Sequence, residues 1–471
     1  MNQRITSLFA GGVILLVLFG VASAGQFEDG QVAFQRGEYA EALRLWRPLA
    51  GQGEAEAQYR VRKMYHKGQG APQDDLQAVA CTARPPIRDM PRRRPTSAGC
   101  TLTATAWSRT MFAPVASHRP GAAGGARKGG IGMTDRAWVL SGGFGIDNLR
   151  VEARAPREPG AGEARVRIEW VSLNRRDLLL IDGVYNPRQN LPVVPCSDGA
   201  GTVEAVGPGC ARVRPGDRVV ISFFPGWIAG EPDMAKLTSA LGGPGDGVLR
   251  DAITIAESAL APLPPSVSTE TAATLPCAAL TAWTAVVEQG AVRPGSVVLT
   301  QGTGGVSLFA LQFAKRLGAR VVATTSSEAK AERLTELGAD AIVNYRREAD
   351  WTKRARELAG GPIDLVVEVG GADTLDASLR LVRPGGTIAL IGVLSGAKAS
   401  ITLPLAVMRQ VRLQGVTCGP RESLDAMIRA IAANGLDPCI SDRFAFADAP
   451  RAFQRMTENA HVGKIAIRTA A

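Results

Sequence analysis

The sequence lacks the cysteine pattern that cross-links small secreted domains. Its seven cysteines are scattered along 471 residues, and none of them forms a C-x-x-C pair. A disulfide framework is therefore not expected, and we interpret these side chains as reduced thiols. Aromatic residues are also few, at 5%, but the hydrophobic content of 45% is sufficient for two or three domains that each bury a core.

Most of the chain also lacks a charge imbalance, although the formal net charge is +10. Residues 81–132 carry nine Lys or Arg against one Asp, and residues 1–80 carry eight basic and eight acidic residues. Everything from Met133 onward has 37 basic against 35 acidic residues and is nearly neutral. The whole-protein charge therefore says nothing about the partners of this large C-terminal part. For that part we expect a small-molecule substrate and no nucleic-acid or membrane partner.

The first 24 residues are typical of a secretory signal peptide. Arg4 precedes the apolar run "LFAGGVILLVLFGV", which is too short to cross a bilayer comfortably, and the small residues Ala22 to Ala24 follow it. The order of charge, apolar run and small residues predicts export of whatever follows. The alternative interpretation is a short buried helix.

Residues 25–80 show small and aromatic side chains at helical spacing, interrupted by glycines that end each helix. The pattern from Ala55 to Val79 resembles the Sel-one-like family of tetratricopeptide-type repeats. The resemblance covers about one and a half units, whereas such stacks need about three repeats to be stable. We expect a partial fragment. An exported helical-repeat adaptor is the functional alternative of a different class.

Residues 81–132 contain no Glu, a single Asp and no apolar period. Their arginines allow the interpretation of a nucleic-acid or membrane arm. We favour a frame-shifted, disordered linker between a truncated exported protein and a complete enzyme that begins near Met133. The enzyme would then be cytoplasmic, and the export signal would belong to another protein. Tryptic peptides from this segment in the native protein would contradict the hypothesis.

From Met133 the pattern is strand-rich to about Pro264 and then alternates strand and helix, which predicts an α/β fold. The right-handed crossover rule makes the second sheet parallel and doubly wound. We expect a catalytic domain over residues 133–264, a Rossmann domain over 265–405 and a return to the catalytic domain over 406–471. The candidate strands of the parallel sheet are "GSVVLTQ", "ARVVATT", "DAIVNY", "IDLVVEV", "GTIALIGV" and "VRLQGV".

A glycine turn between the first of these strands and a helix predicts dinucleotide binding. Gly302 permits the tight turn, Gly304 lets the backbone approach a pyrophosphate, and Ser307 stands at the third position of G-x-G-x-x-G. The strand before the turn and the apolar face of the helix after it supply the context that the motif requires. The expected contacts in the turn are Gly302, Thr303, Gly304, Gly305 and Val306.

The end of the next strand bears on which dinucleotide binds. NAD enzymes carry an acidic residue there, whereas this chain has Thr324, Thr325, Ser326 and Ser327, with Lys330 one helical turn later. Hydroxyls and a cation favour NADPH over NADH, which stays the second choice. The alternative interpretation is that Ser326 caps the next helix and Lys330 is a solvated charge. Loops at other strand ends should also contact the cofactor, through Tyr345, Gly370, Gly371, Gly392 and Val393.

Four motifs in order, "SLNRRDLLLIDGVYNP", "LPVVPCSDGAGTVEAVGPGCARVRPGDRVV", "TLPCAALTAWTAV" and "QGTGGVSLFALQFAK", resemble the medium-chain dehydrogenase/reductase superfamily. Within it, the resemblance is to the quinone oxidoreductase-like branch, over about residues 133–467. It implies a GroES-like β-rich domain with the Rossmann domain inserted before its C-terminal tail. It also implies a homodimer, as is common among relatives.

The resemblance bears on zinc as well. Alcohol dehydrogenases of this superfamily bind catalytic zinc through a Cys, a His-Glu pair and a second Cys, and the matching positions here are Asn174, Ser197, Asp198 and Cys277. The cysteines of the structural zinc loop are also missing, and His461 is the one histidine after Met133. A catalytic zinc site needs three protein ligands, so we expect no metal and interpret Cys277 as a packed small hydrophobe.

Without a Lewis acid, the chemistry that fits best is hydride transfer from NADPH to a quinone or an α,β-unsaturated carbonyl. By resemblance Asn174 and Tyr185 lie near the nicotinamide, where an amide and a phenol orient substrate, and Asp177 fixes the local loop. Tyr185 is equally well explained as a turn residue beside Asn186 and Pro187. An NAD(P)-dependent alcohol dehydrogenase is the alternative enzyme. The Gly- and Pro-rich stretch from Phe223 to Leu249 is expected to be a lid with exposed aromatics.

Overall fold

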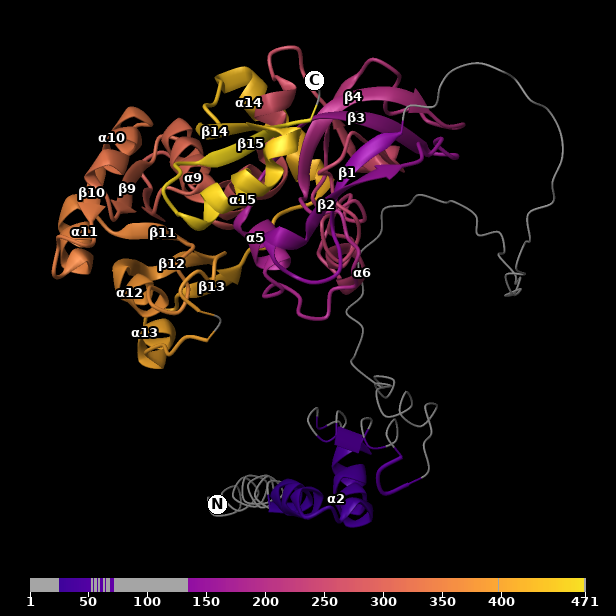
Figure 1. Ribbon diagram of the computed structural model, residues 1–471. Coiled ribbons are helices and arrows are strands. Elements are labelled where there is room, and N and C mark those ends of the chain that lie inside the picture. The colour runs from indigo at the N-terminus through magenta and orange to yellow at the C-terminus, as the bar shows by residue number, and fades with distance from the viewer. Residues whose placement is uncertain are drawn as a thin grey trace, which may run out of the picture. The chain divides into compact units, whose positions relative to one another are not determined.

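The computed structural model describes residues 25–51, single positions between 54 and 71, residues 134–396 and residues 398–469 (Figure 1). The expected signal peptide (1–24) and linker (81–132) lie outside the described residues. The chain divides into two compact units, residues 1–123 and residues 124–471. Among the described residues, no helix is long and apolar enough to cross a bilayer.

The N-terminal unit is helical, as the spacing of its small and aromatic residues predicts. Residues 25–35 form a helix, Gly37 adopts a positive φ of 79° between helices, and α2 spans Tyr39–Gly51. Trp46 is fully buried, and its indole nitrogen donates to the Phe27 carbonyl over 3.1 Å. A small apolar core therefore holds these helices together, while the resemblance to Sel-one-like repeats stays a prediction.

The second unit begins with a β-rich domain. Its main sheet has the order β14-β15-β3-β4-β5-β7, with β6 paired to β3, and β1 and β2 form a separate antiparallel pair. The strands are β1 (Asp135–Leu140), β2 (Leu149–Arg154), β3 (Glu163–Ser172), β4 (Asp198–Val206), β5 (Arg218–Ile221), β6 (Ala252–Ala256), β7 (Leu260–Pro262), β14 (Ile440–Ala445) and β15 (Lys464–Arg468).

The other domain is a six-stranded parallel sheet of order β10-β9-β8-β11-β12-β13, which confirms the predicted Rossmann architecture. All six candidate strands are present, as β8 (Val297–Gln301), β9 (Arg320–Thr325), β10 (Ala341–Asn344), β11 (Ile363–Glu368), β12 (Val382–Leu390) and β13 (Arg412–Gly415). The helices that alternate with them are α9 (Gly305–Arg316), α10 (Glu328–Glu336), α11 (Trp351–Ala359), α12 (Leu375–Leu381) and α13 (Leu403–Met408). Because β13 belongs to this sheet, the domain extends beyond the boundary expected at residue 405.

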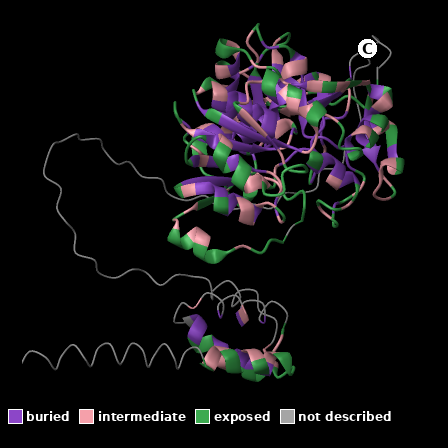
Figure 2. Cartoon of the chain, turned by 90° about the vertical axis from the view of Figure 1, so that its left-hand side faces the viewer, coloured by how far each residue is buried: buried purple, intermediate pink, exposed green. Residues whose placement is uncertain are grey.

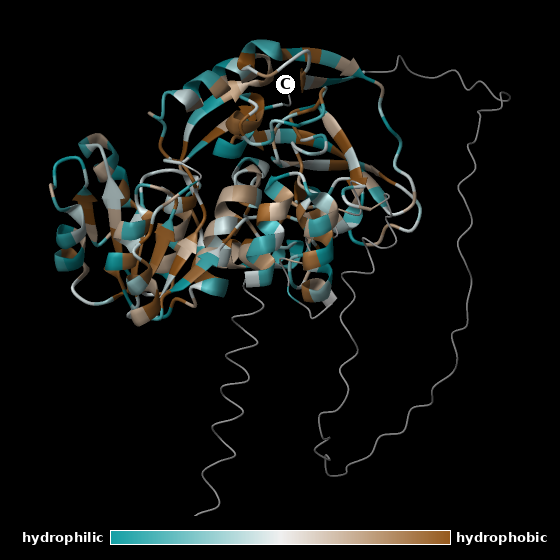
Figure 3. Cartoon of the chain, turned by 90° about the horizontal axis from the view of Figure 1, so that it is seen from below, coloured by the Kyte–Doolittle hydropathy of each residue, from teal (hydrophilic) through white to brown (hydrophobic). Residues whose placement is uncertain are grey.

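The remaining helices surround the β-rich domain or join it to the α/β domain. They are α5 (Arg175–Ile181), α6 (Met234–Leu237), α7 (Thr269–Ala273), α8 (Leu280–Trp283), which lies between two π-helical turns (Leu275–Ala279 and Thr284–Gln289), α14 (Arg421–Asn434) and α15 (Ala449–Thr457). The strands are largely buried and hydrophobic, and are coloured purple in Figure 2 and brown in Figure 3. The outer helices include exposed, hydrophilic turns, which are green in Figure 2 and teal in Figure 3. One apolar core cluster includes residues of α7, α8, α9 and α14. This cluster makes a continuous connection between the domains.

One local expectation is wrong. The aromatics of the Gly- and Pro-rich stretch are buried rather than exposed, with Phe223 at 3% and Trp227 at 7% accessibility, because they pack into the core shared with α7 and α8.

Helix α9 packs its apolar face on the sheet, as expected, and it is buried on other faces as well, since all residues from Ser307 to Ala314 are buried. It packs against β8 and β9 and also against α8.

Candidate functional site

The glycine turn after β8 has the geometry that the sequence predicts. Gly302 has a φ of 74°, which a side chain would strain, and Gly304 precedes the first turn of α9. Ser307, which replaces the third glycine, donates its hydroxyl hydrogen to the Gln301 carbonyl over 2.6 Å. The serine therefore closes the turn instead of loosening it. The N-terminus of the 12-residue helix α9 presents unpaired amides and a positive dipole end, which suits a pyrophosphate.

A buried carboxylate organises the strand ends beside this turn. Glu368, the last residue of β11, has no accessible surface. Its Oε1 accepts hydrogen bonds from the backbone amides of Gly370 (2.9 Å) and Gly371 (3.0 Å), and its Oε2 accepts from Gln301 Nε2 (2.7 Å). The sequence interpretation missed Glu368, although a charged residue inside the apolar run "IDLVVEV" was a usable signal, because a buried charge needs partners.

The expected loops meet at the same edge of the sheet. Gly371 has a φ of 90°, and a side chain there would come within 2.8 Å of the Cα of Val393. Gly392 lies so close to the Val369 carbonyl that an added Cβ would be 2.0 Å from its oxygen. Glycine is therefore required by close backbone approach, and Val393 is left 55% exposed at this edge.

The end of β9 carries the predicted hydroxyls. Thr324 and Thr325 are buried, and Ser327, not Ser326, is the N-cap residue of α10, with no capping hydrogen bond from its side chain. The capping explanation for Ser326 is therefore wrong. Tyr345 directly follows β10, is 45% exposed, and its backbone amide donates to the Thr325 carbonyl. These groups lie at the carboxyl edge of the sheet.

Lys330 makes contacts that the sequence did not predict. Its Nζ donates to the carbonyls of Asn459 (2.9 Å) and His461 (3.2 Å), so helix α10 is tied to the segment that leads into β15. Burial lowers the pKa of Lys330, and Arg455 lowers it further. The role of this ammonium toward a ribose phosphate stays a prediction.

Asn174 and Asp177 shape the start of α5. The backbone amide of Asn174 donates to Asp177 Oδ2 over 2.8 Å, and the Asp177 amide donates to the Asn174 carbonyl over 2.9 Å. Asp177 therefore fixes this loop, in keeping with the role expected for it. Complete burial raises the pKa of Asp177 to about 6, an effect that Arg176 opposes and Asp198 reinforces.

Tyr185 lies over a buried arginine. The Arg176 guanidinium carbon is 4.9 Å from the centre of the Tyr185 ring and 5.0 Å from that of Phe223. Arg176 is 9% exposed, and its NH1 donates to the Leu241 carbonyl over 2.9 Å. Tyr185 is half exposed. Its ring thus has a cation–π partner beyond its turn, and its contact with substrate stays a prediction.

Lys464 is a second buried charged group that the sequence interpretation missed. It is 2% exposed, and its Nζ donates to Asn174 Oδ1 over 2.6 Å and to the Leu173 carbonyl over 2.8 Å. Asp198 Oδ2 lies 3.8 Å from the same nitrogen and accepts from the Cys277 amide over 3.1 Å. Because Lys464 is about 290 residues distant in sequence, no local pattern links it to Asn174.

The residues at the positions that match zinc ligands do not fit a metal. The side chains of Asn174 and Asp198 already lie next to the Lys464 ammonium. The Ser197 hydroxyl donates to Asp198 Oδ1 over 2.7 Å. Burial, and then Asp198, raises the pKa of the Cys277 thiol well above its ordinary value. Within residues 134–396 and 398–469 no group of three His, Cys, Asp or Glu side chains is arranged to hold a metal.

The glycine turn and this polar cluster are adjacent. The Gly463 amide donates to the Thr303 carbonyl over 2.9 Å, and Gly304 and Gly463 form an isolated parallel bridge. A Cβ on Gly305 would lie 2.9 Å from Lys464 Cδ. The predicted cofactor turn and the predicted catalytic residue Asn174 are therefore brought together through the segment that begins β15.

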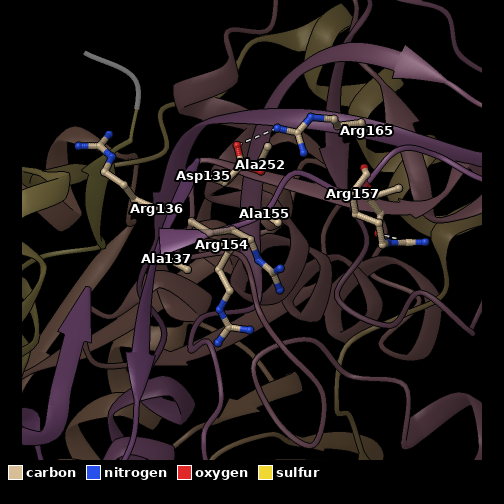
Figure 4. A pocket seen from close by; sticks show the side chains of 10 residues that line it. Asp135, Arg136, Ala137, Arg154, Ala155, Arg157, Arg165 and Ala252 are labelled. Atoms are coloured by element: carbon tan, nitrogen blue, oxygen red, sulfur yellow. Dashed lines mark hydrogen bonds and ion pairs between the residues drawn. The ribbon is translucent and has the colours of Figure 1, made fainter. Parts of the chain in front are cut away.

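A separate pocket lies in the β-rich domain and is lined by Asp135, Arg136, Ala137, Arg154, Ala155, Arg157, Arg165, Arg250, Ala252 and Thr254 (Figure 4). Its arginines have carboxylate partners. Arg165 pairs with Asp135 at 2.7 Å, and the figure marks this contact. The others pair with Asp251, Glu152, Glu163 and Asp246. The pocket is thus largely neutralised within the fold, and it contains none of the predicted site residues.

Comparisons with known proteins agree with the two-domain architecture. Residues 160–265 match the family model of the alcohol dehydrogenase GroES-like domain, and residues 305–433 match that of the zinc-binding dehydrogenase. A zinc-type alcohol dehydrogenase-like protein of Schizosaccharomyces pombe is 36% identical over 332 residues, which cover 69% of this chain and 96% of that protein.

Two other similar proteins have names that indicate different reactions. An acryloyl-coenzyme A reductase of Metallosphaera sedula is 28% identical over 330 residues, covering 68% of this chain and 95% of that protein. The crystal structure of an NAD-dependent alcohol dehydrogenase superposes with a TM-score of 0.65 at 34% identity and covers 71% of this chain and all of that one. The shared part is the second compact unit.

Proposed function

The chain belongs to the medium-chain dehydrogenase/reductase superfamily of NAD(P)-dependent oxidoreductases, and from this premise we propose that it reduces an α,β-unsaturated carbonyl or a quinone with NADPH and without zinc. The observation that carries the proposal is the arrangement around Asn174. Three of the four side chains at the positions matching zinc ligands, those of Asn174, Ser197 and Asp198, are engaged with the Lys464 ammonium or with one another. The relative called a reductase of acryloyl-coenzyme A acts, by its name, on a conjugated carbonyl.

We propose that the cofactor lies along the carboxyl edge of the parallel sheet. The turn Gly302 to Val306 would hold the pyrophosphate, and Thr324, Ser326, Ser327 and Lys330 would hold the adenosine ribose and its phosphate. The loops with Gly370, Gly371, Gly392 and Val393 would line the nicotinamide half, with Tyr345 near the adenosine. The nicotinamide supplies a hydride to the substrate. Ser326 and Ser327 directly follow β9, and Glu328 after them accepts from Asn344 Nδ2 and pairs with Arg347. The hydroxyls and the Lys330 cation are what favour NADPH.

The proposed role of Asn174 is to donate a hydrogen bond to the substrate carbonyl oxygen. When the β-carbon receives the hydride, the electron pair of the carbon–carbon double bond moves toward that oxygen, and the amide hydrogens stabilise the negative charge. A proton from water then completes the reduction at the α-carbon, and the cofactor leaves oxidised. Tyr185, half exposed over Arg176, would orient the substrate.

An NAD(P)-dependent alcohol dehydrogenase is the second candidate, and the printed names of the relatives favour it over the first. The Schizosaccharomyces pombe relative is named for zinc and for alcohol, and the superposed crystal structure is named for NAD. That reaction needs a base that takes the hydroxyl proton and a cation that stabilises the alkoxide. A buried ammonium beside Asn174 is the group of this chain that could supply the positive charge.

The test is a substrate panel with the purified full-length chain. NADPH and NADH oxidation are followed with enones and quinones, and NADP and NAD reduction with primary and secondary alcohols, before and after dialysis against a zinc chelator. The proposal expects enone or quinone turnover that survives chelation. Alcohol oxidation that chelation abolishes and zinc restores would establish the second candidate and overturn the first.

Cys277 offers an independent test of the zinc question. Cys277→Ser removes the thiol but leaves the Cys277 backbone amide that donates to Asp198. A metal-free enzyme should keep its kcat within about threefold, whereas a zinc enzyme should lose bound metal and activity together. Cys210→Ser, at a partly exposed thiol of the β-rich domain away from Asn174, is the matched control.

We also propose a homodimer through the outer edge of the α/β domain. Strand β13 is the last strand of its sheet, and the apolar side chains beside it are exposed: Leu403 (64%), Val407 (70%), Met408 (80%) and Leu413 (41%). A free strand edge next to exposed apolar side chains of α13 is a surface that proteins normally cover. A second copy of the chain, which presents the same strand, would extend the sheet and bury this surface.

The remaining expectations concern origin rather than chemistry. Membership of the quinone oxidoreductase-like branch, the Sel-one-like origin of residues 25–80 and the frame-shifted linker are proposals. If the linker hypothesis holds, the enzyme acts in the cytoplasm and residues 1–132 take no part in the reaction. The adaptor alternative would require the N-terminal unit to bind a partner protein when expressed within the full chain.

A further inference from the structure

Lys464 is a buried cation, and its burial calls for a physical explanation. An ammonium removed from water is costly unless it is hydrogen-bonded and compensated. Here the compensation is complete: Asn174 Oδ1 and the Leu173 carbonyl accept its hydrogens, and the Asp198 carboxylate lies 3.8 Å away. An apolar residue would fill the same space with less penalty, so the retained charge points to a role in the site.

The ammonium determines which way the Asn174 amide faces. Lys464 Nζ has donors only, so it can be satisfied by the oxygen of the amide and never by its nitrogen. Oδ1 therefore faces Lys464, and the NH₂ group is directed to the opposite side. That nitrogen, Nδ2, is buried and has no hydrogen-bond partner. Buried donors without a partner are rare in folded proteins and call for a functional explanation.

The position of this donor agrees with a substrate role. Lys464 lies against the turn that we propose for the pyrophosphate, because a Cβ on Gly305 would be 2.9 Å from Lys464 Cδ. Residue 463 is bound to the same turn through its amide and the Thr303 carbonyl. The cluster is thus held in register with the cofactor domain by the backbone as well as by side chains.

We propose that Lys464 is a positioning residue, resting on the proposed function: its ammonium is the resident cation of the site and orients Asn174 so that Nδ2 donates to the substrate oxygen. The same ammonium lies against Asn174 and Asp198, two of the four residues that match zinc ligands, and occupies the place of a metal cation beside them. Asp198, held by Ser197 and by the Cys277 amide, keeps the ammonium in place from the other side.

The first variant is Asn174→Asp. A carboxylate still accepts from Lys464, so the fold and NADPH affinity should persist, but the NH₂ donor is lost. We expect kcat to fall on the order of 100-fold with the cofactor Kd changed less than about threefold. Unchanged kcat in this variant would overturn the proposal.

The second variant, Lys464→Met, removes the ammonium, and Lys464→Arg retains a cation. Methionine should lower kcat by about the same factor as Asn174→Asp, and arginine should restore part of it. In the double variant Asn174→Asp/Lys464→Met the two losses should not multiply, because Lys464 acts through Asn174. Losses that multiply would mean that the two residues act independently, which would overturn the proposal. The matched control is Lys315→Met, which removes an ammonium on α9 that is hydrogen-bonded to Asp340, and it should leave kcat unchanged.

Two further outcomes distinguish a folding defect, or a failure of the proposed function, from a failure of the role proposed for Lys464. If Lys464→Met does not fold, Asn174→Asp and Lys464→Arg still decide the question. All variants are assayed on whichever substrate the wild-type chain turns over. If wild type oxidises alcohols without metal and the variants behave as described, the proposed function fails and the role of Lys464 stands. If wild type binds zinc in proportion to its activity, both fail.

Discussion

Gln301 and Glu368 join the ends of two neighbouring strands, with 2.7 Å between Gln301 Nε2 and Glu368 Oε2. Gln301 is the last residue of β8 and immediately precedes the glycine turn, while Glu368 ends β11 and accepts from the amides of Gly370 and Gly371. One buried carboxylate therefore holds two of the loops that we propose to line the cofactor. Its loss should be felt in both stability and cofactor affinity.

Glu368→Gln tests this arrangement. The glutamine amide keeps one acceptor and introduces a donor where the surrounding groups are donors, so at least one charge-assisted hydrogen bond is lost. We expect a loss of unfolding free energy of about 2 kcal/mol or more and a rise in the NADPH Kd of about tenfold. Urea unfolding and fluorescence titration measure these. Glu357→Gln, on the exposed face of α11, is the control, and equal effects of both substitutions would contradict the prediction.

Lys330→Met tests the choice of cofactor. If the ammonium binds a ribose phosphate, the KM for NADPH should rise about tenfold while the KM for NADH stays within twofold. If it serves only to tie α10 to the carbonyls of Asn459 and His461, both KM values should change together. Steady-state kinetics with the two cofactors separate these outcomes, and Lys353→Met on α11 is the matched control.

Asp177 should make stability depend on pH. Its pKa is about 6 in the folded chain, against an ordinary value of 3.8, because burial disfavours the charged form. The stability that this group contributes is therefore present below about pH 4 and is lost as the pH rises through 6. Between pH 4.5 and 7.5 wild type should lose on the order of 1–3 kcal/mol relative to Asp177→Asn.

Urea unfolding of both proteins at the two pH values measures this difference. Asp182→Asn, at the exposed end of α5, should leave the pH dependence of wild type intact. Parallel stability profiles of wild type and Asp177→Asn would show that the Asp177 carboxyl titrates alike in the folded and unfolded chains.

Val407→Asp should convert the proposed dimer to a monomer. Val407 is 70% exposed on α13, so a charge there costs the monomer little, yet it would place two carboxylates in a symmetric apolar contact. Light scattering after size-exclusion chromatography reports the mass. A wild-type monomer, or a variant that remains dimeric, would refute the prediction, and Val151→Asp at an exposed position of β2 is the control.

The elements that follow from local periodicity could be predicted from the sequence. All six strands of the parallel sheet lie where short apolar runs alternate with helical segments in the sequence. The turn at Gly302 precedes α9, as the motif requires. The departure at Ser307 also has a local reason, since its hydroxyl bonds to the Gln301 carbonyl six residues earlier. Short-range geometry constrains these features, so short stretches of sequence contain the necessary information.

The polar cluster could not be predicted in the same way. Lys464 reaches Asn174 because β15 pairs with β3, and no pattern near either residue reports that pairing. The burial of Phe223 and Trp227 likewise depends on α7 and α8, which pack over them. Composition alone suggested an exposed lid. In both cases the deciding contact is made between segments distant in sequence.

The pairing of β15 with β3 also imposes an order on the making of the protein. The β-rich domain begins near residue 135, but its sheet lacks β14 and β15 until the whole parallel sheet has been synthesised. Ser172 of β3 has no partner in β15 until Ala466 has been synthesised. A nascent chain that stops early therefore has neither a closed sheet nor the ammonium that orients Asn174. The polar cluster around Asn174 is complete only in a polypeptide in which β15 has emerged from the ribosome and docked.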